Sequence, residues 1–178
     1  MKSVLDTNVL VNMLNSDRNP GGYLTEMIRK MIDDKRIICL DSGQRIDKEY
    51  FKMLGQTLIN RHAAEGKPSE SIVRQMLGFF IALGGVPYPY KERHQVDKTD
   101  KLMNCIGQQI PLDEDMDRVF VYVAAKAGAT LVTDDYDHIL SDDGKREESL
   151  KKCAERFGDR NFDLMDSHSA KLTFDNLS

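Results

Sequence analysis

The sequence predicts an α/β protein with a mainly parallel central sheet and helices on both of its faces. Short apolar runs alternate with stretches of helical periodicity, in the order strand, helix, helix, strand, helices, strand. This alternation is typical of parallel α/β folds. At 178 residues the chain is long enough to bury one core, so we expect a single domain over residues 1–178.

The first half of the chain contains two predicted strands and several predicted helices. Residues 2–5 and the run RIICL at 36–40 are short and apolar, as in buried strands. Apolar residues at helical spacing follow both strands, and the motif NPGG marks a turn. The predicted helices of this half are 9–14, 23–34, 45–64 and 69–83, and two glycines end the last one.

The second half is predicted to be irregular before it returns to alternating helices and strands. Residues 84–112 contain three prolines and a mixed-charge run, so we expect a loop-rich insertion with one short helix near 101–106. A helix from Asp117 leads into a strand at 129–133. A charged helical addition near 141–160 then precedes a last strand with the sequence NFDLM.

Composition argues against several classes of protein. The net charge of −4 disfavours a broadly basic protein that coats nucleic acid. No apolar stretch approaches the roughly 20 residues of a membrane span, and polar residues interrupt the N-terminal apolar run. We therefore expect a cytoplasmic protein without a membrane partner. The three cysteines, Cys39, Cys105 and Cys153, are widely spaced, so we expect buried thiols and neither a disulfide framework nor a thiolate zinc site.

Acidic residues interrupt the apolar pattern in four separate elements. Asp6 and the pair Asp134 and Asp135 directly follow predicted strands, whose carboxyl ends form the functional edge of a parallel sheet. Asp117 and Glu49 lie on the apolar stripes of their helices, so we expect both to point inward. Each acid alone could be a helix cap or a core-edge ion pair, but together they predict one cluster.

Such a cluster predicts a divalent metal site. Crowded carboxylates repel one another and are costly to desolvate, so they either take up protons or bind cations. One or two Mg²⁺ or Mn²⁺ ions suit these oxygen ligands, and the arrangement suits hydrolysis of phosphodiesters. We assign Asp6, Glu49, Asp117 and Asp135 as metal-binding and catalytic acids, with Asp134 as a further metal-binding candidate.

Two of these segments resemble motifs of the PIN-domain nuclease family. SVLDTNVLV, residues 3–11, is similar to the opening motif, with Asp6 as the first metal-binding acid. Thr7 and Asn8 match its polar neighbours and are candidate substrate-binding residues. RIDKEYFKML resembles the segment that carries the second acid, here Glu49.

The third and fourth motifs of the family resemble DRVFVYVAAKAGATLVTDD, residues 117–135. Asp117 and Asp135 match the third and fourth acids. Thr133 matches the small hydroxylated residue after the last motif strand, and it is a further candidate for substrate binding.

The resemblance implies a Mg²⁺- or Mn²⁺-dependent endoribonuclease with a Rossmann-like α/β/α sandwich. It also implies a homodimer and a role as a toxin with an antitoxin partner or as an RNA-processing component. The segments 84–112 and 141–160 make the chain longer than the small PIN toxins. These additions weigh against the toxin role more than against the nuclease chemistry.

Basic residues interleaved with tyrosines lie within the predicted insertion, and such a run can hold single-stranded RNA through phosphate contacts and base stacking. Arg93 and Lys98 are its candidate substrate-binding residues, and the run also contains Lys91, His94, Lys101, Tyr88 and Tyr90. A solvated loop is the other interpretation of this run. His138 lies close in sequence to Asp135 and is a further candidate for substrate contact.

Two other functions are consistent with the sequence. A phosphoacceptor receiver domain also gathers acids and Mg²⁺ at strand ends, and Asp41 after IICL is a candidate acceptor. The strand LVTDD, however, lacks the lysine that this chemistry requires. A non-catalytic PIN-like binding or scaffold protein would keep the fold without turnover.

Overall fold

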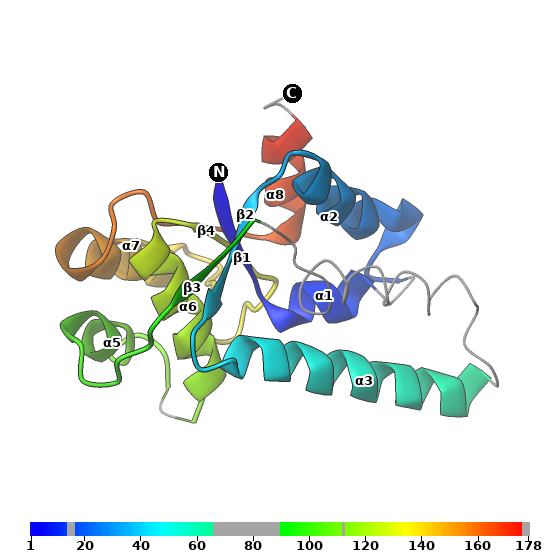
Figure 1. Cartoon of the computed structure of the whole chain (residues 1–178), viewed down its shortest axis with the longest axis horizontal. Coiled ribbons are helices and arrows are strands. Elements are labelled where there is room, and N and C mark those ends of the chain that lie inside the picture. The colour runs from blue at the N-terminus through cyan, green and yellow to red at the C-terminus, as the bar shows by residue number, and fades with distance from the viewer. Residues whose placement is uncertain (14–16, 66–89, 112, 176–178) are drawn as a thin grey trace.

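The computed structural model describes residues 1–13, 17–65, 90–111 and 113–175 (Figure 1). These residues form a five-stranded sheet in which every strand pair is parallel. Helices cover both faces of the sheet, so the predicted α/β class is confirmed.

The order of the strands places a functional edge at the centre of the sheet. The strands are β1 (Lys2–Leu5), β2 (Ile37–Asp41), β3 (Lys91–His94), β4 (Thr130–Val132) and β5 (Asp163–Met165), arranged as β3-β2-β1-β4-β5. From β1 the chain builds outward to β2 and β3 on one side, whereas β4 and β5 extend the other side. The order therefore reverses between β1 and β4, and ligands of open α/β sheets bind outside the carboxyl ends of the strands at such a switch point.

The helices form a layer on each face of the sheet (Figure 1). One layer contains α5 (Lys101–Ile106), α6 (Asp115–Ala127) and α7 (Lys145–Phe157); the other contains α1 (Thr7–Met13), α2 (Tyr23–Asp33), α3 (Arg45–Glu65) and α8 (Ser167–Asp175). A short 3-10 turn, Pro20–Gly22, stands where NPGG predicts a turn. Across the described ranges, no helix combines the length and apolar character that crossing a bilayer needs.

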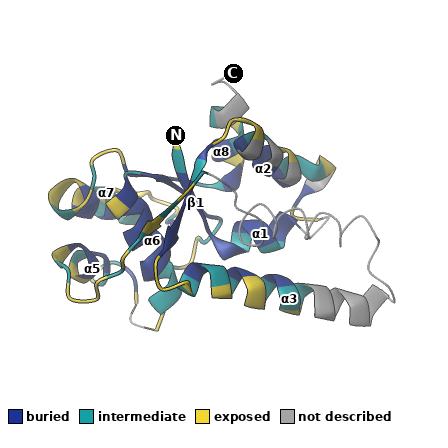
Figure 2. Cartoon of the chain, in the orientation of Figure 1, coloured by how far each residue is buried: buried dark blue, intermediate teal, exposed yellow. Residues whose placement is uncertain are grey.

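Helix α6 lies at the centre of the core. It packs against β1, β2 and β4 on one side and against α5 and α7 on the other. Every residue from Arg118 to Ala125 is buried, and Figure 2 shows the helix dark blue over this stretch. The apolar residues that predict this helix are therefore those that join the sheet to its outer helices.

Most predicted elements agree with the structure to within a few residues. The apolar run at 2–5 is β1, the run at 36–40 corresponds to β2, and the short helix predicted near 101–106 is α5. The helix predicted at 69–83 lies outside the described residues.

The expectation of an irregular segment at 84–112 is wrong for its central part. Lys91–His94 form β3, which pairs with β2 at the edge of the sheet. The sequence KERH contains no apolar run because exposed and half-buried residues alternate along this edge strand. Helix α8, Ser167–Asp175, was not predicted either.

The prediction for the cysteines is correct only for Cys39, which is a buried thiol. Cys105 on α5 and Cys153 on α7 form a disulfide, with their Cα atoms 5.8 Å apart. The two residues are 48 positions apart in the chain, so their spacing in the sequence does not indicate that they form a disulfide. They meet because α5 and α7 pack side by side.

Candidate metal centre

An acidic pocket of about 270 Å³ lies at the carboxyl ends of β1 and β4. Its walls come from α1, α3, the start of α6 and the loop after β4. Five lining residues are acidic: Asp6, Glu49, Glu114, Asp117 and Asp135. The structure thus brings the four predicted acids into one pocket and adds Glu114 to them.

Asp6 is held between the two central strands. Its backbone N–H donates a hydrogen bond to the Val132 carbonyl at 2.9 Å, which extends the pairing of β1 with β4. The Thr133 hydroxyl donates to Asp6 Oδ2 at 2.6 Å. Thr133 is fully buried, so its hydrogen bond positions Asp6, and the prediction that it binds substrate gains no support from this geometry.

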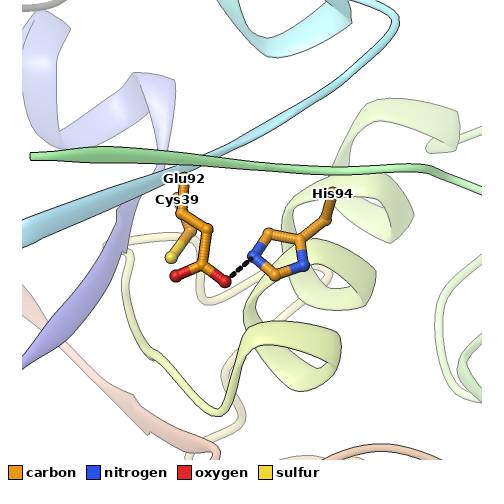
Figure 3. A group of neighbouring side chains, drawn as sticks. All are labelled: Cys39, Glu92 and His94. Carbon is orange, nitrogen blue, oxygen red and sulfur yellow. Dashed lines mark ion pairs between the residues drawn. The ribbon is translucent and has the colours of Figure 1, made fainter.

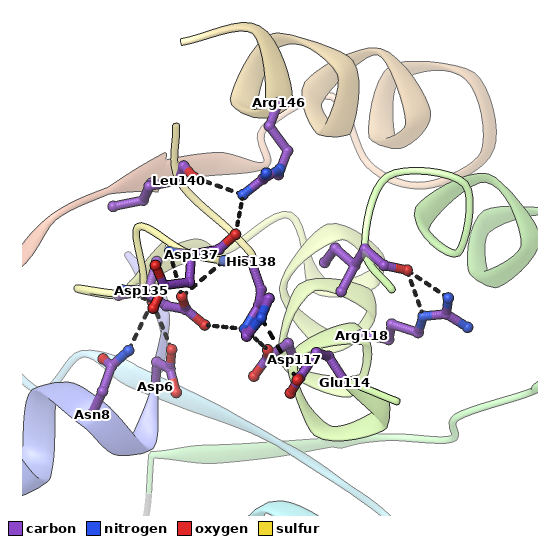
Figure 4. A network of polar contacts seen from close by, with 12 residues as sticks. Asp6, Asn8, Glu114, Asp117, Arg118, Asp135, Asp137, His138, Leu140 and Arg146 are labelled. Atoms are coloured by element: carbon purple, nitrogen blue, oxygen red, sulfur yellow. Dashed lines mark hydrogen bonds and ion pairs between the residues drawn. The ribbon is translucent and has the colours of Figure 1, made fainter. Parts of the chain in front are cut away.

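Asp135 lines the pocket and also orders the loop that follows it. Its Oδ1 accepts the backbone N–H groups of Asp137 and His138, both at 2.9 Å. Arg146 Nη1 donates to the carbonyls of Asp137 and Leu140, each at 2.8 Å (Figure 4). Helix α7, which carries Arg146, therefore supports the loop from behind.

Asp134 does not line the pocket. Its carboxylate accepts hydrogen bonds from the backbone N–H and the hydroxyl of Ser167, both at 2.9 Å, at the start of α8. It also accepts from Asn12 Nδ2 at 3.2 Å. The assignment of Asp134 to the metal site therefore gains no support from the geometry, because its oxygens bind the start of α8.

Glu114, at the N-cap of α6, and His138, in the loop after β4, complete this part of the wall. His138 Nδ1 lies 3.4 Å from Asp117 Oδ2 and 3.5 Å from Asp135 Oδ2, and its Nε2 lies 3.6 Å from Glu114 Oε1 (Figure 4). One ligand atom from each of Glu114, Asp117 and His138 falls within 4.8 Å of the others. Sequence reasoning missed Glu114, which precedes the first residue of α6 and has non-helical backbone angles, so helical periodicity does not mark it.

The remaining walls come from α3 and α1. Glu49 lines the pocket from α3, and the nearby Lys52 Nζ lies 3.7 Å from its carboxylate. Thr7 and Asn8 also line it, and Asn8 Oδ1 accepts the backbone N–H of Asp134 at 3.1 Å. Asn12 and Arg18 complete this side, where Arg18 Nη1 donates to Asn12 Oδ1 at 3.2 Å. No periodic pattern marks these two residues in the sequence.

Burial and mutual repulsion raise the pKa values of two of these acids. Burial raises the pKa of Asp6 to about 6, and the charge of Asp135 adds to this effect while the Thr133 hydrogen bond opposes it. Burial also raises the pKa of Asp117 to about 7, with further contributions from Asp6, Asp135 and Glu114 that His138 partly offsets. The cluster therefore disfavours its own charge and favours proton uptake or cation binding.

The donor set fits a hard divalent cation. Carboxylate oxygens from several elements converge on one small pocket, as Mg²⁺ and Mn²⁺ prefer. The Thr7 hydroxyl lies at the pocket, is buried, and has no hydrogen-bond partner among the described residues. The acids outnumber the two basic side chains that line the pocket, Arg18 and His138.

The predicted basic run does not reach the pocket. Arg93 forms two hydrogen bonds of 2.9 Å with Asp47, and it donates to the Asp41 carbonyl at 2.8 Å. Lys98 Nζ lies 3.3 Å from Asp115 Oδ2. Neither basic side chain lines the acidic pocket, so the prediction that Arg93 and Lys98 bind substrate gains no support from its geometry. Tyr88 lies outside the described residues.

Asp41 is unsuited to accept a phosphoryl group. It is fully buried, and its two carboxylate oxygens accept the backbone N–H groups of Arg45 and Ile46 at 2.9 and 2.8 Å. Asp41 therefore caps the start of α3. The receiver-domain alternative loses its only candidate acceptor.

Fold and site together define an α/β protein with an acidic pocket at the switch point of its parallel sheet. Comparison with family models, with curated proteins and with solved structures finds no match to this chain. The likeness to PIN-domain nucleases therefore depends on the motif residues themselves.

Proposed function

We propose that the protein is a Mg²⁺- or Mn²⁺-dependent endoribonuclease of the PIN type. The observation that carries this proposal is the convergence of Asp6, Glu49, Asp117 and Asp135 on one pocket. These side chains come from the ends of two strands and from two helices, so their meeting is a property of the whole fold. A purely structural role would not require four carboxylates to be gathered at a cost in desolvation.

In this proposal the four carboxylates hold one or two divalent cations. A bound cation would supply a nucleophilic water at neutral pH and stabilise negative charge on the phosphodiester. Thr133 fixes Asp6, and the backbone N–H groups of Asp137 and His138 fix Asp135. Such preorganisation matters because small displacements of catalytic groups reduce rates steeply.

The substrate in this proposal is single-stranded RNA. Arg18 and the amide of Asn8 line the pocket, where they can meet phosphate oxygens. His138 is the one imidazole on this lining, and its two nitrogens face three of the acids. We further propose a cytoplasmic homodimer that acts as an RNA-processing nuclease or as a toxin with an antitoxin partner.

Cleavage of end-labelled, mixed-sequence single-stranded RNA by the purified protein with Mn²⁺ tests the proposal. We expect cleavage that disappears with EDTA and in Asp6→Asn, because the amide keeps the shape of the side chain but loses its charge. Asp142→Asn is the matched control, since Asp142 is exposed on the loop before α7 and lies outside the pocket. Wild-type rates in Asp6→Asn would overturn the proposal.

Calorimetric titration of Mn²⁺ separates the nuclease from the scaffold alternative. Mn²⁺ binding that Asp6→Asn weakens would support the metal centre, even where the first RNA tested is not cut. Absence of both cleavage and Mn²⁺ binding would favour a non-catalytic scaffold.

A further inference from the structure

We propose a second metal site, of the zinc class, formed by Cys39, Glu92 and His94 on strands β2 and β3. It lies apart from the acidic pocket and uses different donor atoms, so it is independent of the proposed nuclease activity. Its presence would also modify the expectation, drawn from cysteine spacing, that the chain has no thiolate zinc ligand.

The register of β2 and β3 brings the three side chains together. Cys39 pairs with Glu92, and His94 follows two residues later on β3, opposite Asp41. Side chains two residues apart share a face of a strand, so Glu92 and His94 point the same way. Figure 3 shows all three on one side of the strands, with the Glu92 carboxylate between the sulfur and the imidazole.

The distances approach those of a tetrahedral zinc centre. His94 Nε2 lies 3.2 Å from Glu92 Oε1, close to the roughly 3.3 Å between two ligands that are each about 2.05 Å from zinc. One donor atom from each of the three residues falls within 4.8 Å of the others. Binding of an ion would require a rotation of the Glu92 or His94 side chain toward the sulfur, and a water would supply the fourth ligand.

The chemistry of the donors selects the metal. A thiolate, an imidazole and a carboxylate suit Zn²⁺ and other borderline transition ions, whereas Mg²⁺ avoids sulfur. His94 Nε2 is buried and forms no hydrogen bond of good geometry within the described residues, and its contact at 3.2 Å is with Glu92, the other proposed ligand. Burial lowers the pKa of His94, and metal ligation requires its neutral form.

Cys39 must lose a proton to bind the ion. Burial raises the pKa of this thiol to about 12, so it is protonated at neutral pH without metal. Binding of Zn²⁺ forms the zinc–sulfur bond and releases the thiol proton to solvent. The affinity should therefore rise with pH.

Lys2 competes with the ion for Glu92. Its ammonium lies 2.9 Å from Glu92 Oε2 and 3.2 Å from Oε1. Both side chains are about one-third exposed, so the lysine can turn toward solvent and leave the carboxylate open to an entering ion. Since β3 is the edge strand, the bound ion would join it to the rest of the sheet.

Titration of the oxidised, metal-free protein with Co²⁺ tests this site. Cys39 is then the only thiol in the chain, because Cys105 and Cys153 are joined, and intact mass verifies this state. We expect a thiolate-to-cobalt charge-transfer band in the near ultraviolet that saturates at one equivalent. Zn²⁺ should abolish the band by competition, whereas Mg²⁺ should not.

Variants distinguish this site from the acidic pocket. We expect Cys39→Ala to remove the band, His94→Gln and Glu92→Gln to weaken Co²⁺ binding by about 10-fold or more, and Asp6→Asn to leave the band unchanged. Lys2→Gln should tighten binding, because it removes the competing ammonium. Absence of a band in the wild type, or a band that persists in Cys39→Ala, would overturn the proposal. If Cys39→Ala, at a buried position, does not fold, Glu92→Gln tests the site instead, because Glu92 is partly exposed.

Discussion

Asp134 and Asp135 are adjacent in the chain, but their side chains serve different parts of the molecule. Asp135 lines the acidic pocket, whereas Asp134 binds the start of α8 through Ser167. Both follow the same strand, and both are acids, so the sequence alone does not separate them.

We expect Asp135→Asn to lower metal-dependent RNA cleavage by about 100-fold or more, because the variant removes a ligand charge from the pocket. Asp134→Asn should leave cleavage near the wild-type rate. It should lower the free energy of unfolding by about 1 kcal/mol, because it weakens the charged hydrogen bonds to Ser167. Single-turnover cleavage and urea unfolding of both variants measure these effects, and equal loss of cleavage in both would contradict the division of roles.

The raised pKa values of Asp6 and Asp117 predict how the metal-free protein responds to pH. The folded state holds these protons up to about pH 6 and 7, while unfolded carboxyls release them near 3.8. Between pH 3.8 and the folded pKa values, the folded state binds more protons than the unfolded state does. The stability that protonated Asp6 and Asp117 contribute is therefore complete below pH 3.8, and it is lost as the pH rises through the folded pKa values.

Asp117→Asn is therefore expected to stabilise the metal-free protein at pH 8 by on the order of 1–3 kcal/mol relative to wild type. The advantage should disappear at pH 4, where the wild-type carboxyl is protonated. Thermal unfolding in EDTA at both pH values tests this, with Asp142→Asn as the exposed control. A variant that is less stable than wild type at pH 8 and equal at pH 4 would show that the pocket favours the charged acid.

The residues of the site were predictable where they break a pattern. Asp6, Glu49, Asp117 and Asp135 interrupt apolar strands or stripes, and all four line the pocket. Arg18 could not be predicted in this way, because it lies in a loop, where no periodic pattern marks a residue. It lines the pocket because folding brings its side chain to Asn12.

At the scale of elements, the turn between α6 and β4 requires a glycine. Gly128 has φ +61°, and a Cβ there would lie 2.6 Å from Asp159 Cγ. Gly144, before α7, has φ +69° but no atom within 4 Å of such a Cβ. The two glycines share a backbone conformation and differ in the space around them.

We expect Gly128→Ala to destabilise the protein by about 2–4 kcal/mol, since it adds a steric clash to the cost of the left-handed backbone. Gly144→Ala should cost only about 1 kcal/mol, from the backbone alone. Urea unfolding of the matched pair separates the two effects. Equal losses would show that the Asp159 side chain moves aside freely.

The disulfide between Cys105 and Cys153 also acts at the scale of elements, because it links α5 to α7. It closes a long loop between Cys105 and Cys153, and such cross-links stabilise proteins chiefly by restricting the unfolded chain.

Reduction of the disulfide is expected to lower the free energy of unfolding by about 2–4 kcal/mol. Cys153→Ser should show a similar loss and no further response to dithiothreitol. Thermal unfolding with and without the reductant measures both effects. A wild-type Tm that does not change on reduction would show that helix packing alone joins α5 to α7.

Elements were predictable where an apolar pattern marks them. The buried strands β1 and β2 and the core helix α6 have such patterns. The edge strand β3 does not, because its KERH sequence alternates between exposed and half-buried positions, and its place depends on pairing with β2. Tertiary context decides such edge strands more than intrinsic propensity does.

At the scale of the whole molecule, the reversal of strand order between β1 and β4 assembles the acidic pocket. Neither half of the sheet contains it alone, since Asp6 follows β1 and Asp135 follows β4. Metal binding should therefore stabilise the complete fold.

We expect saturating Mn²⁺ to raise the Tm of the wild-type protein. At a Mn²⁺ concentration of 100 times the Kd, the free energy of unfolding should increase by about 2.7 kcal/mol. The double variant Asp6→Asn/Asp117→Asn should show no such increase, although its metal-free form should be the more stable one. Differential scanning calorimetry with Mn²⁺ and with EDTA measures both differences. An equal Mn²⁺ effect in the two proteins would place the ion elsewhere.

The hydrogen bond between Thr133 and Asp6 joins residues that are 127 positions apart in the chain. A ribosome adds about 5–20 residues per second, so at least several seconds separate the synthesis of these two residues. During that interval the nascent chain carries Asp6 without the threonine that orients it or the second strand that completes the pocket. If the pocket cuts RNA, a chain that has not yet been extended to Thr133 lacks the assembled pocket and so cannot cut its own message.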